Sequence, residues 1–187
     1  GTKGLARALP ELDTDDVVEI LEDLNENDRN VIIKKLPKTE RILVEEAFTF
    51  PENSAGRLMQ RDFLAFPEFW TVGQTIDHMR KNIYEEEKNF YSIFIINPKQ
   101  RILGELSLAK LLSNYRSVRL KDIMQSEFQS VNVNTDQEEI ALLFQQYGLV
   151  NLPVIDNEKR VLGVITVDDI VDVINEEAEE DFFGLGG

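Results

Sequence analysis

A pattern of about 60 residues occurs twice in the chain, and this repeat limits the fold more than any other feature. Each copy runs from a short Met-Gln segment through a strand, a helix, two strands joined by a tight turn, and a second helix. Met59 and Met124 are 65 positions apart, whereas Gly104 and Gly163 are 59 apart, because the first copy carries an insertion at 83–89. One copy is too short to bury a good core alone, so we expect the two to pack together as one domain.

Strands and helices inside each copy follow from apolar alternation, turn residues and helix caps. In the first copy we expect strands at 63–66, 91–96 and 101–106, a turn at 97–98, and helices beginning at Thr71 and Ser107. In the second copy we expect strands at 128–133, 151–155 and 159–165, a turn at 156–157, a helix beginning at Thr135, and a helix from Val167 with Thr166 as its N-cap. Two of these helix starts, Thr71 with Gln74 and Thr135 with Glu138, have the spacing of a capping box.

Helical spacing of apolar residues predicts three short helices before the repeats, at 13–24, 27–36 and 39–48. Short helices joined by tight turns are typical of a solenoid-like stack, and three of them form only a small core. Leu5, Ala6 and Leu9 are interpreted as the remnant of a preceding apolar face. We therefore expect a mixed α+β and α/β fold in which the C-terminal part of a larger helical domain precedes the repeats.

The net charge of −15 comes from two short stretches. The first acidic segment, residues 11–28, holds nine Asp and Glu, and the second acidic segment, residues 168–181, holds eight; neither contains Lys or Arg. The remaining residues hold 18 acids and 20 bases. Because no basic stripe is left for a phosphate backbone, we do not expect a nucleic-acid partner.

The acidic segments suggest a metal-binding mechanism. Mg²⁺ takes oxygen ligands, often one or two carboxylates with retained waters, so acidic faces of two helices suit weak shared sites. If the segments face each other, they repel until a cation bridges them, and this is the differential affinity that a conformational shift requires. In the first segment the candidate ligands are Asp15, Asp16, Glu19 and Asp23. The alternative interpretation is two solvated helix faces.

Several classes of protein are disfavoured. The chain has no Cys and one His, His78, which excludes disulfides, thiolate metal sites and a histidine metal cluster. With no nucleophile and base in a recognisable motif, we do not expect an enzyme. No run of about 18 apolar residues is present, so we expect no membrane insertion by this chain itself.

The residues also resemble a known family. The second copy, from IMQ at 123–125 to VDDIVDVI at 167–174, resembles a CBS repeat, and two in tandem resemble a Bateman module. PENSAGRLM at 51–59 and TVDDIVDVINEEAEED at 166–181 are similar to the cytosolic part of MgtE-type magnesium transporters. The resemblance implies these boundaries: N domain 1–53, first CBS repeat 54–117, second CBS repeat 118–178, and the start of a connecting helix at 179–187.

The same resemblance implies a function. In that family a helical N domain and a CBS pair form a homodimeric Mg²⁺ sensor that closes a transmembrane pore, here absent from the chain. The expected location is the cytoplasmic face of the membrane. Positions matching the family's acidic ligands are Asp169, Asp172, Glu177, Glu180 and Asp181. Mn²⁺, Co²⁺ and Ca²⁺ remain open as alternatives to Mg²⁺.

The resemblance to a CBS pair also implies a nucleotide-binding signature, G-x-x-[ST]-x-x-D, whose residues contact ATP or AMP. The second copy keeps it as Gly163, Thr166 and Asp169, whereas the first copy has Lys110 in place of the Asp. The alternative function is therefore an adenine-nucleotide-sensing CBS module without metal dependence. A third alternative is an acidic adaptor that binds only proteins.

Overall fold

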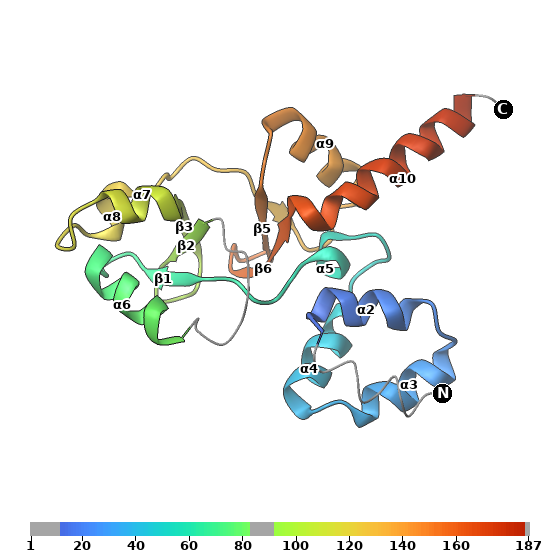
Figure 1. Cartoon of the computed structure of the whole chain (residues 1–187). Coiled ribbons are helices and arrows are strands. Elements are labelled where there is room, and N and C mark those ends of the chain that lie inside the picture. Colours follow the sequence, from blue (N-terminus) through green and yellow to red (C-terminus); the bar gives the residue numbers. More distant parts are fainter. Residues whose placement is uncertain (1–11, 83–91, 186–187) are drawn as a thin grey trace. The chain divides into compact units, whose positions relative to one another are not determined.

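The computed structural model describes residues 12–82 and 92–185 (Figure 1). The insertion at 83–89 and the apolar positions Leu5, Ala6 and Leu9 lie outside the described residues. The chain divides into two compact units. Unit 1 contains the described residues up to Asp62 together with 131–154 and 163–185, and unit 2 contains the described residues of 63–130 together with 155–162.

Unit 1 begins with the three predicted helices, which are confirmed to within about two residues at each end. They are α2 (Thr14–Glu22), α3 (Glu26–Lys35) and α4 (Lys38–Ala47), blue to cyan in Figure 1. Their apolar faces meet in one small core around Leu21, Ile32 and Val44. Asn25 caps α3, because its side chain accepts a hydrogen bond from Asp28 N. This core fixes α2 with its acidic face outward.

The segment that follows, residues 54–60, packs on the second repeat, and we call it the leader. It contains α5 (Ala55–Leu58), which contacts α2. Gln60 N donates to Val164 O (2.8 Å), and Val164 N donates to Gln60 O (2.9 Å). A Cβ added to Gly163 would lie 2.6 Å from Gln60 O and 2.7 Å from Met59 Sδ. Gly163 is therefore required by the close approach of the leader.

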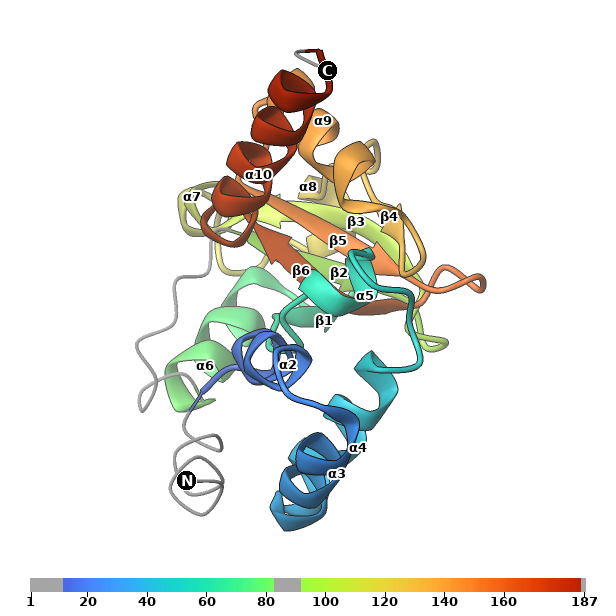
Figure 2. The ribbon, with the colours of Figure 1, turned by 90° about the vertical axis from the view of Figure 1, so that its right-hand side faces the viewer.

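The second repeat supplies the remaining elements of unit 1. Its sheet has the order β4-β5-β6, from β4 (Val131–Asn132), β5 (Asn151–Ile155) and β6 (Val161–Thr166). Its helices are α9 (Gln137–Tyr147) and α10 (Val167–Leu185), which lie against each other in both views (Figures 1 and 2). α10 continues without interruption past 179, where the sequence analysis begins a connecting helix. Before Gly184 it contains no Gly or Pro that would end it.

Some sequence predictions for the second repeat are wrong. The strand expected at 128–133 is reduced to the two residues of β4. The strand expected from 159 begins at Val161, because Asp156 to Arg160 form the turn. The capping box expected between Thr135 and Glu138 is replaced by an Asp136 cap, whose side chain accepts from Glu138 N at 3.1 Å. An Asp directly before the first helical residue takes over the cap.

Unit 2 holds the rest of the first repeat, together with residues 118–130 and 155–162 of the second repeat. Its elements are β1 (Ala65–Pro67), α6 (Val72–Asn82), β2 (Ser92–Ile96), β3 (Ile102–Ser107), α7 (Leu108–Ser113) and α8 (Leu120–Ile123). β2 pairs parallel with β1 and antiparallel with β3. The capping box predicted at Thr71 is confirmed, with Gln74 N donating to Thr71 Oγ1 (3.2 Å) and Thr71 N donating to Gln74 Oε1 (2.9 Å).

Unit 2 repeats the glycine contact of unit 1. A Cβ added to Gly104 would lie 2.7 Å from Met124 Sδ, and Gln125 exchanges two backbone hydrogen bonds with Glu105. The Met-Gln segment that begins each repeat therefore packs on the last strand of the other repeat. Because each Met-Gln segment packs on the other repeat, the two compact units do not coincide with the two repeats. The predicted repeat boundaries remain predictions.

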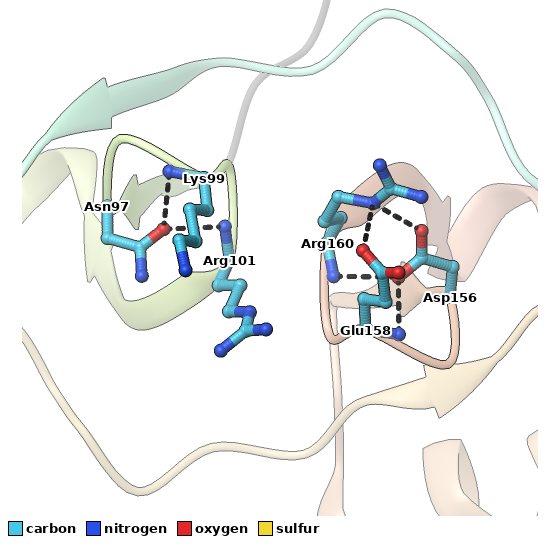
Figure 3. Close-up of polar contacts among 6 residues, drawn as sticks. All are labelled: Asn97, Lys99, Arg101, Asp156, Glu158 and Arg160. Carbon is cyan, nitrogen blue, oxygen red and sulfur yellow. Dashed lines mark hydrogen bonds and ion pairs between the residues drawn. The ribbon is translucent and has the colours of Figure 1, made fainter.

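The two hairpin turns of the repeats lie together in unit 2 (Figure 3). Asn97 Oδ1 accepts from the backbone N of Lys99 and of Arg101, both at 3.0 Å. Asp156 Oδ1 accepts from the equivalent backbone N atoms of Glu158 and Arg160, both at 2.9 Å. The shared geometry supports the prediction that the two segments are copies of one pattern.

The glycine contact predicts the result of one substitution. Gly163→Ala should lower the free energy of unfolding by about 1–3 kcal/mol, because the new methyl group meets a backbone oxygen that is held in the Gln60–Val164 pairing. Urea unfolding followed by circular dichroism measures this change. The matched control is Gly184→Ala in α10, where a Cβ meets nothing within 4 Å and should leave stability unchanged or slightly higher. Equal effects of the two substitutions on the free energy of unfolding would contradict the conclusion that Gly163 is required by the close approach of the leader.

Candidate metal site

Carboxylates of both acidic segments meet in one pocket of about 300 Å³ within unit 1. From α2 it is lined by Asp15, Asp16, Glu19 and Glu22. From α10 it is lined by Asp168, Asp169, Asp172 and Glu176. Asn53, Arg57 and Gln137 also line it, and Arg57 is the only Lys or Arg among its lining residues.

Helical periodicity explains why these acids share a pocket. In α10 the acids that line the pocket recur three or four positions apart, while Ile170 is buried on another face. In α2 the buried residues are Val17, Val18 and Leu21, which turn the intervening acids away from the helical core. Each helix therefore presents a continuous acidic face because its apolar face is fixed in a core.

Asp15 is the most perturbed group in the pocket. Burial, followed by the charges of Asp169, Asp16 and Asp13, raises the pKa of Asp15 to about 8. Its Oδ1 atom is buried and has no hydrogen-bond partner among the described residues. A buried carboxylate oxygen without a partner is unfavourable, and either a proton or a cation would relieve it.

Neighbouring acids are affected in the same direction. Burial, with the charges of Asp13 and Asp169, raises the pKa of Asp16. Burial, with the charges of Asp16 and Asp172 among others, raises the pKa of Glu19. These influences connect α2 with α10, so the two acidic faces repel each other across the pocket.

One group of carboxylates is close enough to share an ion. Asp13, Asp15 and Asp16 each offer an oxygen, and these oxygens lie within 4.8 Å of one another. Oxygen-only sites of this kind suit hard cations such as Mg²⁺ and Ca²⁺. These three residues therefore fit a divalent cation at the start of α2, and two of them, Asp15 and Asp16, also line the pocket.

Two acids of the second segment are already held by neighbours. Asp169 Oδ2 accepts from Gln60 Nε2 (2.7 Å), Thr166 Oγ1 (2.8 Å) and Thr166 N (3.2 Å). Glu177 Oε1 accepts from the buried Gln137 Nε2 at 2.8 Å. Asp169 thus caps α10 and ties it to the leader, and Glu177 ties α10 to α9.

The pocket includes some predicted ligands and omits others. Asp15, Asp16, Glu19, Asp169 and Asp172 line it. Asp23, Glu177, Glu180 and Asp181 are not among its lining residues. Glu180 is exposed. Its pKa is raised first by the charge of Glu177, then by burial, and then by the charges of Glu176, Asp181 and Glu138 of α9.

Sequence reasoning missed several lining residues. The missed acids are Glu22, Asp168 and Glu176, and the missed neutral or basic residues are Asn53, Arg57 and Gln137. Spacing of three or four along each helix could have identified the acids. Nothing in the local sequence indicates the others, because Asn53, the leader and α9 reach the pocket only through tertiary packing.

The predicted nucleotide residues have structural roles in this structure. Gly163 accommodates the leader, and Thr166 and Asp169 hydrogen-bond to each other at the start of α10. In the first repeat, Ser107 Oγ accepts from the backbone N of Lys110 at 3.1 Å, which caps α7. The residues that match the signature are thus occupied by helix capping and by close packing.

Comparison with known proteins identifies the family. Family models match at residues 2–53, as the MgtE intracellular N domain, and at 120–176, as a CBS domain. A solved structure, the cytosolic domain of the Mg²⁺ channel MgtE in complex with ATP, is 32% identical with a TM-score of 0.84, and the match covers 90% of this chain and 69% of that one. The chain belongs to the MgtE family of magnesium transporters.

Other relatives agree with this assignment. The magnesium transporter MgtE of Thermus thermophilus is 37% identical over 150 residues, which are 80% of this chain and 33% of that protein. The soluble part of a magnesium transporter has a TM-score of 0.86 and 28% identity, covering 92% of this chain and 67% of that one. The chain spans about a third of the length of the curated relatives it matches. Among the described residues, no helix has both the length and the apolar character needed to cross a membrane.

These matches confirm the predicted fold class, a helical MgtE-type N domain combined with CBS repeats. They also place the chain in a transporter family rather than in an enzyme family. The predicted ligand residues remain predictions.

The raised pKa of Asp15 predicts a pH dependence. The folded chain binds the proton of the Asp15 carboxyl more tightly than the unfolded chain does. The resulting contribution to the free energy of unfolding is complete below pH 3.8 and is lost as the pH rises towards about 8. The metal-free chain should therefore become less stable between pH 5 and pH 8. Asp15→Asn should flatten this decline, as measured by urea unfolding at several pH values. An unchanged slope in the variant would rule out Asp15 as its source.

Proposed function

We propose that this chain is a cytosolic Mg²⁺-sensing module that regulates a magnesium-conducting pore. The observation that carries the proposal is the convergence of α2 and α10 carboxylates on one pocket. One of them is Asp15, whose buried Oδ1 has no hydrogen-bond partner among the described residues. The family supports it, since its members include a magnesium transporter and an Mg²⁺ channel. The module acts at the cytoplasmic face of the membrane, and the pore is supplied by another part of the protein.

The mechanism follows from the charges of the pocket. Without a cation, the acids of α2 and α10 repel, and Asp15 is relieved only by a proton. Asp15, Asp16 and Glu19 on α2 and Asp172 on α10 would hold a hydrated Mg²⁺, whose positive charge would replace the repulsion with attraction. Ion binding thus favours the arrangement in which α2 and α10 are close, and the difference in affinity drives the shift.

α10 is the element that passes the shift on to the pore. It begins at the pocket, where Asp169 anchors its first turn to Thr166 and Gln60. It then extends over 19 residues to Leu185. A change at the pocket is carried along a continuous helix, which moves as one body. Mg²⁺ binding closes the pore through this helix.

The module works as a homodimer. Exposed apolar side chains remain on the repeat helices, with Leu142 57%, Tyr147 51% and Val171 45% exposed. Such apolar side chains on α9 and α10 favour burial against another protein surface. A second copy of the chain is the expected partner, because symmetric dimers are the commonest soluble oligomers. The partners are therefore a second copy and the pore domain.

A second candidate ligand is adenine nucleotide. It is supported by the solved relative that holds ATP and by the signature residues Gly163, Thr166 and Asp169. A nucleotide could act together with Mg²⁺ or, in the alternative function, as the sole signal without metal dependence.

Thermal unfolding tests the sensor. Mg²⁺ at tenfold its Kd should raise Tm by about 3–6 °C at constant ionic strength. The double substitution Asp16→Asn with Asp172→Asn should abolish most of this rise, because it removes one ligand from each helix. The matched control, Asp23→Asn with Glu179→Gln, removes the same charge from the same segments outside the pocket and should retain the rise.

Other results would change the conclusion. A rise produced equally by NaCl would mean that the acidic faces are only screened. A rise with ATP and none with Mg²⁺ would favour the nucleotide-sensing alternative, and no response to either would favour a protein adaptor. Repeating the titration with Mn²⁺, Co²⁺ and Ca²⁺ ranks the ions.

The dimer has its own test. Light scattering should give twice the mass of the 21.5 kDa chain. Leu142→Asp should shift the mass to that of a monomer, because the charge would be buried in the interface. Val31→Asp is the control, since Val31 is 46% exposed but lies on α3. A monomeric wild type would refute the proposed dimer.

A further inference from the structure

Arg57 occupies an unusual place in the acidic pocket. It is the only cationic side chain among the described residues that line the pocket, against eight acids. Its side chain is only 11% exposed, and its Nη1 lies 2.8 Å from Glu22 Oε1. A guanidinium so placed neutralises part of the pocket's charge and occupies one of its carboxylates.

Three contacts hold Arg57 in this position. Nε donates to Phe50 O at 3.0 Å, Nη1 donates to Glu22, and Cζ lies 4.6 Å from the centre of the Phe48 ring. A planar group fixed by two hydrogen bonds and a ring has little freedom to leave. The cation is therefore part of the pocket rather than a mobile surface charge.

Arg29 contacts the same Phe48 ring without reaching the pocket. Its Cζ lies 4.7 Å from the ring centre, and it donates to Leu21 O and Leu24 O. Arg29 is not among the residues that line the pocket. The chain thus holds two arginines on one ring, of which only Arg57 adds charge to the pocket.

We propose that Arg57 is a built-in counter-cation that sets the concentration of divalent ion at which the pocket fills. It competes with the incoming ion in two ways, by reducing the negative potential and by engaging Glu22. Both effects weaken ion binding, so the pocket responds only when the ion is abundant. This inference rests on the proposed Mg²⁺-sensing function and assigns Arg57 a positioning and tuning role rather than that of a ligand.

The test compares the wild-type 187-residue chain with variants at Arg57 and Arg29. The midpoint of Mg²⁺ binding is measured by calorimetric titration at one temperature and constant ionic strength, and the starting Tm is measured without Mg²⁺. Arg57→Gln should lower the starting Tm but move the Mg²⁺ midpoint to a concentration about three- to tenfold lower, because one positive charge is gone. Arg57→Lys should also lower the starting Tm yet keep the midpoint within about twofold of wild type, because the charge stays. Arg29→Gln should lower the starting Tm without moving the midpoint.

The outcomes separate this inference from the proposed function. If the wild type shows no Mg²⁺-specific rise, the sensor itself is refuted. If the wild type responds but Arg57→Gln keeps or raises the midpoint, Arg57 is only structural and the inference is overturned. Arg57→Met is a second neutral variant, which keeps an unbranched apolar stem but lacks the guanidinium. Failure of both neutral variants to fold at saturating Mg²⁺ would also overturn the inference, since tighter ion binding should stabilise them.

Discussion

The structure depends on the packing of residues 54–60 against the last strand of the second repeat. Gln60 pairs with Val164, and Met59 fills the space left by Gly163. Because α2–α4 immediately precede this segment and α5 within it contacts α2, their position is set relative to the second repeat. The acidic face of α2 consequently meets the acidic face of α10.

Holding these faces together has an electrostatic cost. Like charges that are partly removed from water raise each other's pKa, as Asp15 and Asp16 show. The helical core and the leader pairing supply the stability that opposes the repulsion. Under the proposed function such a balance is useful, because a cation that removes the repulsion shifts the equilibrium with little change in packing.

Arg57 fits the same balance. Its guanidinium stabilises the metal-free pocket through Glu22 and joins the leader to the helical core through Phe48 and Phe50. One side chain therefore belongs to both the packing and the charge of the pocket. Under the proposed function, this links the stability of the metal-free state to the concentration of ion that the module detects.

The sequence alone determined the repeat, the three N-terminal helices and the two acidic segments, because periodicity and capping are local properties. Motif resemblance supplied the family, which the comparisons confirm. Only the tertiary structure decided that the acidic faces of α2 and α10 share one pocket and that Asp23 is not among the residues that line it. It also brought in Arg57. The physical reason is that the leader packs on the last strand of the second repeat. The pairing between Gln60 and Val164 joins positions about a hundred residues apart, and local sequence patterns do not encode such a contact.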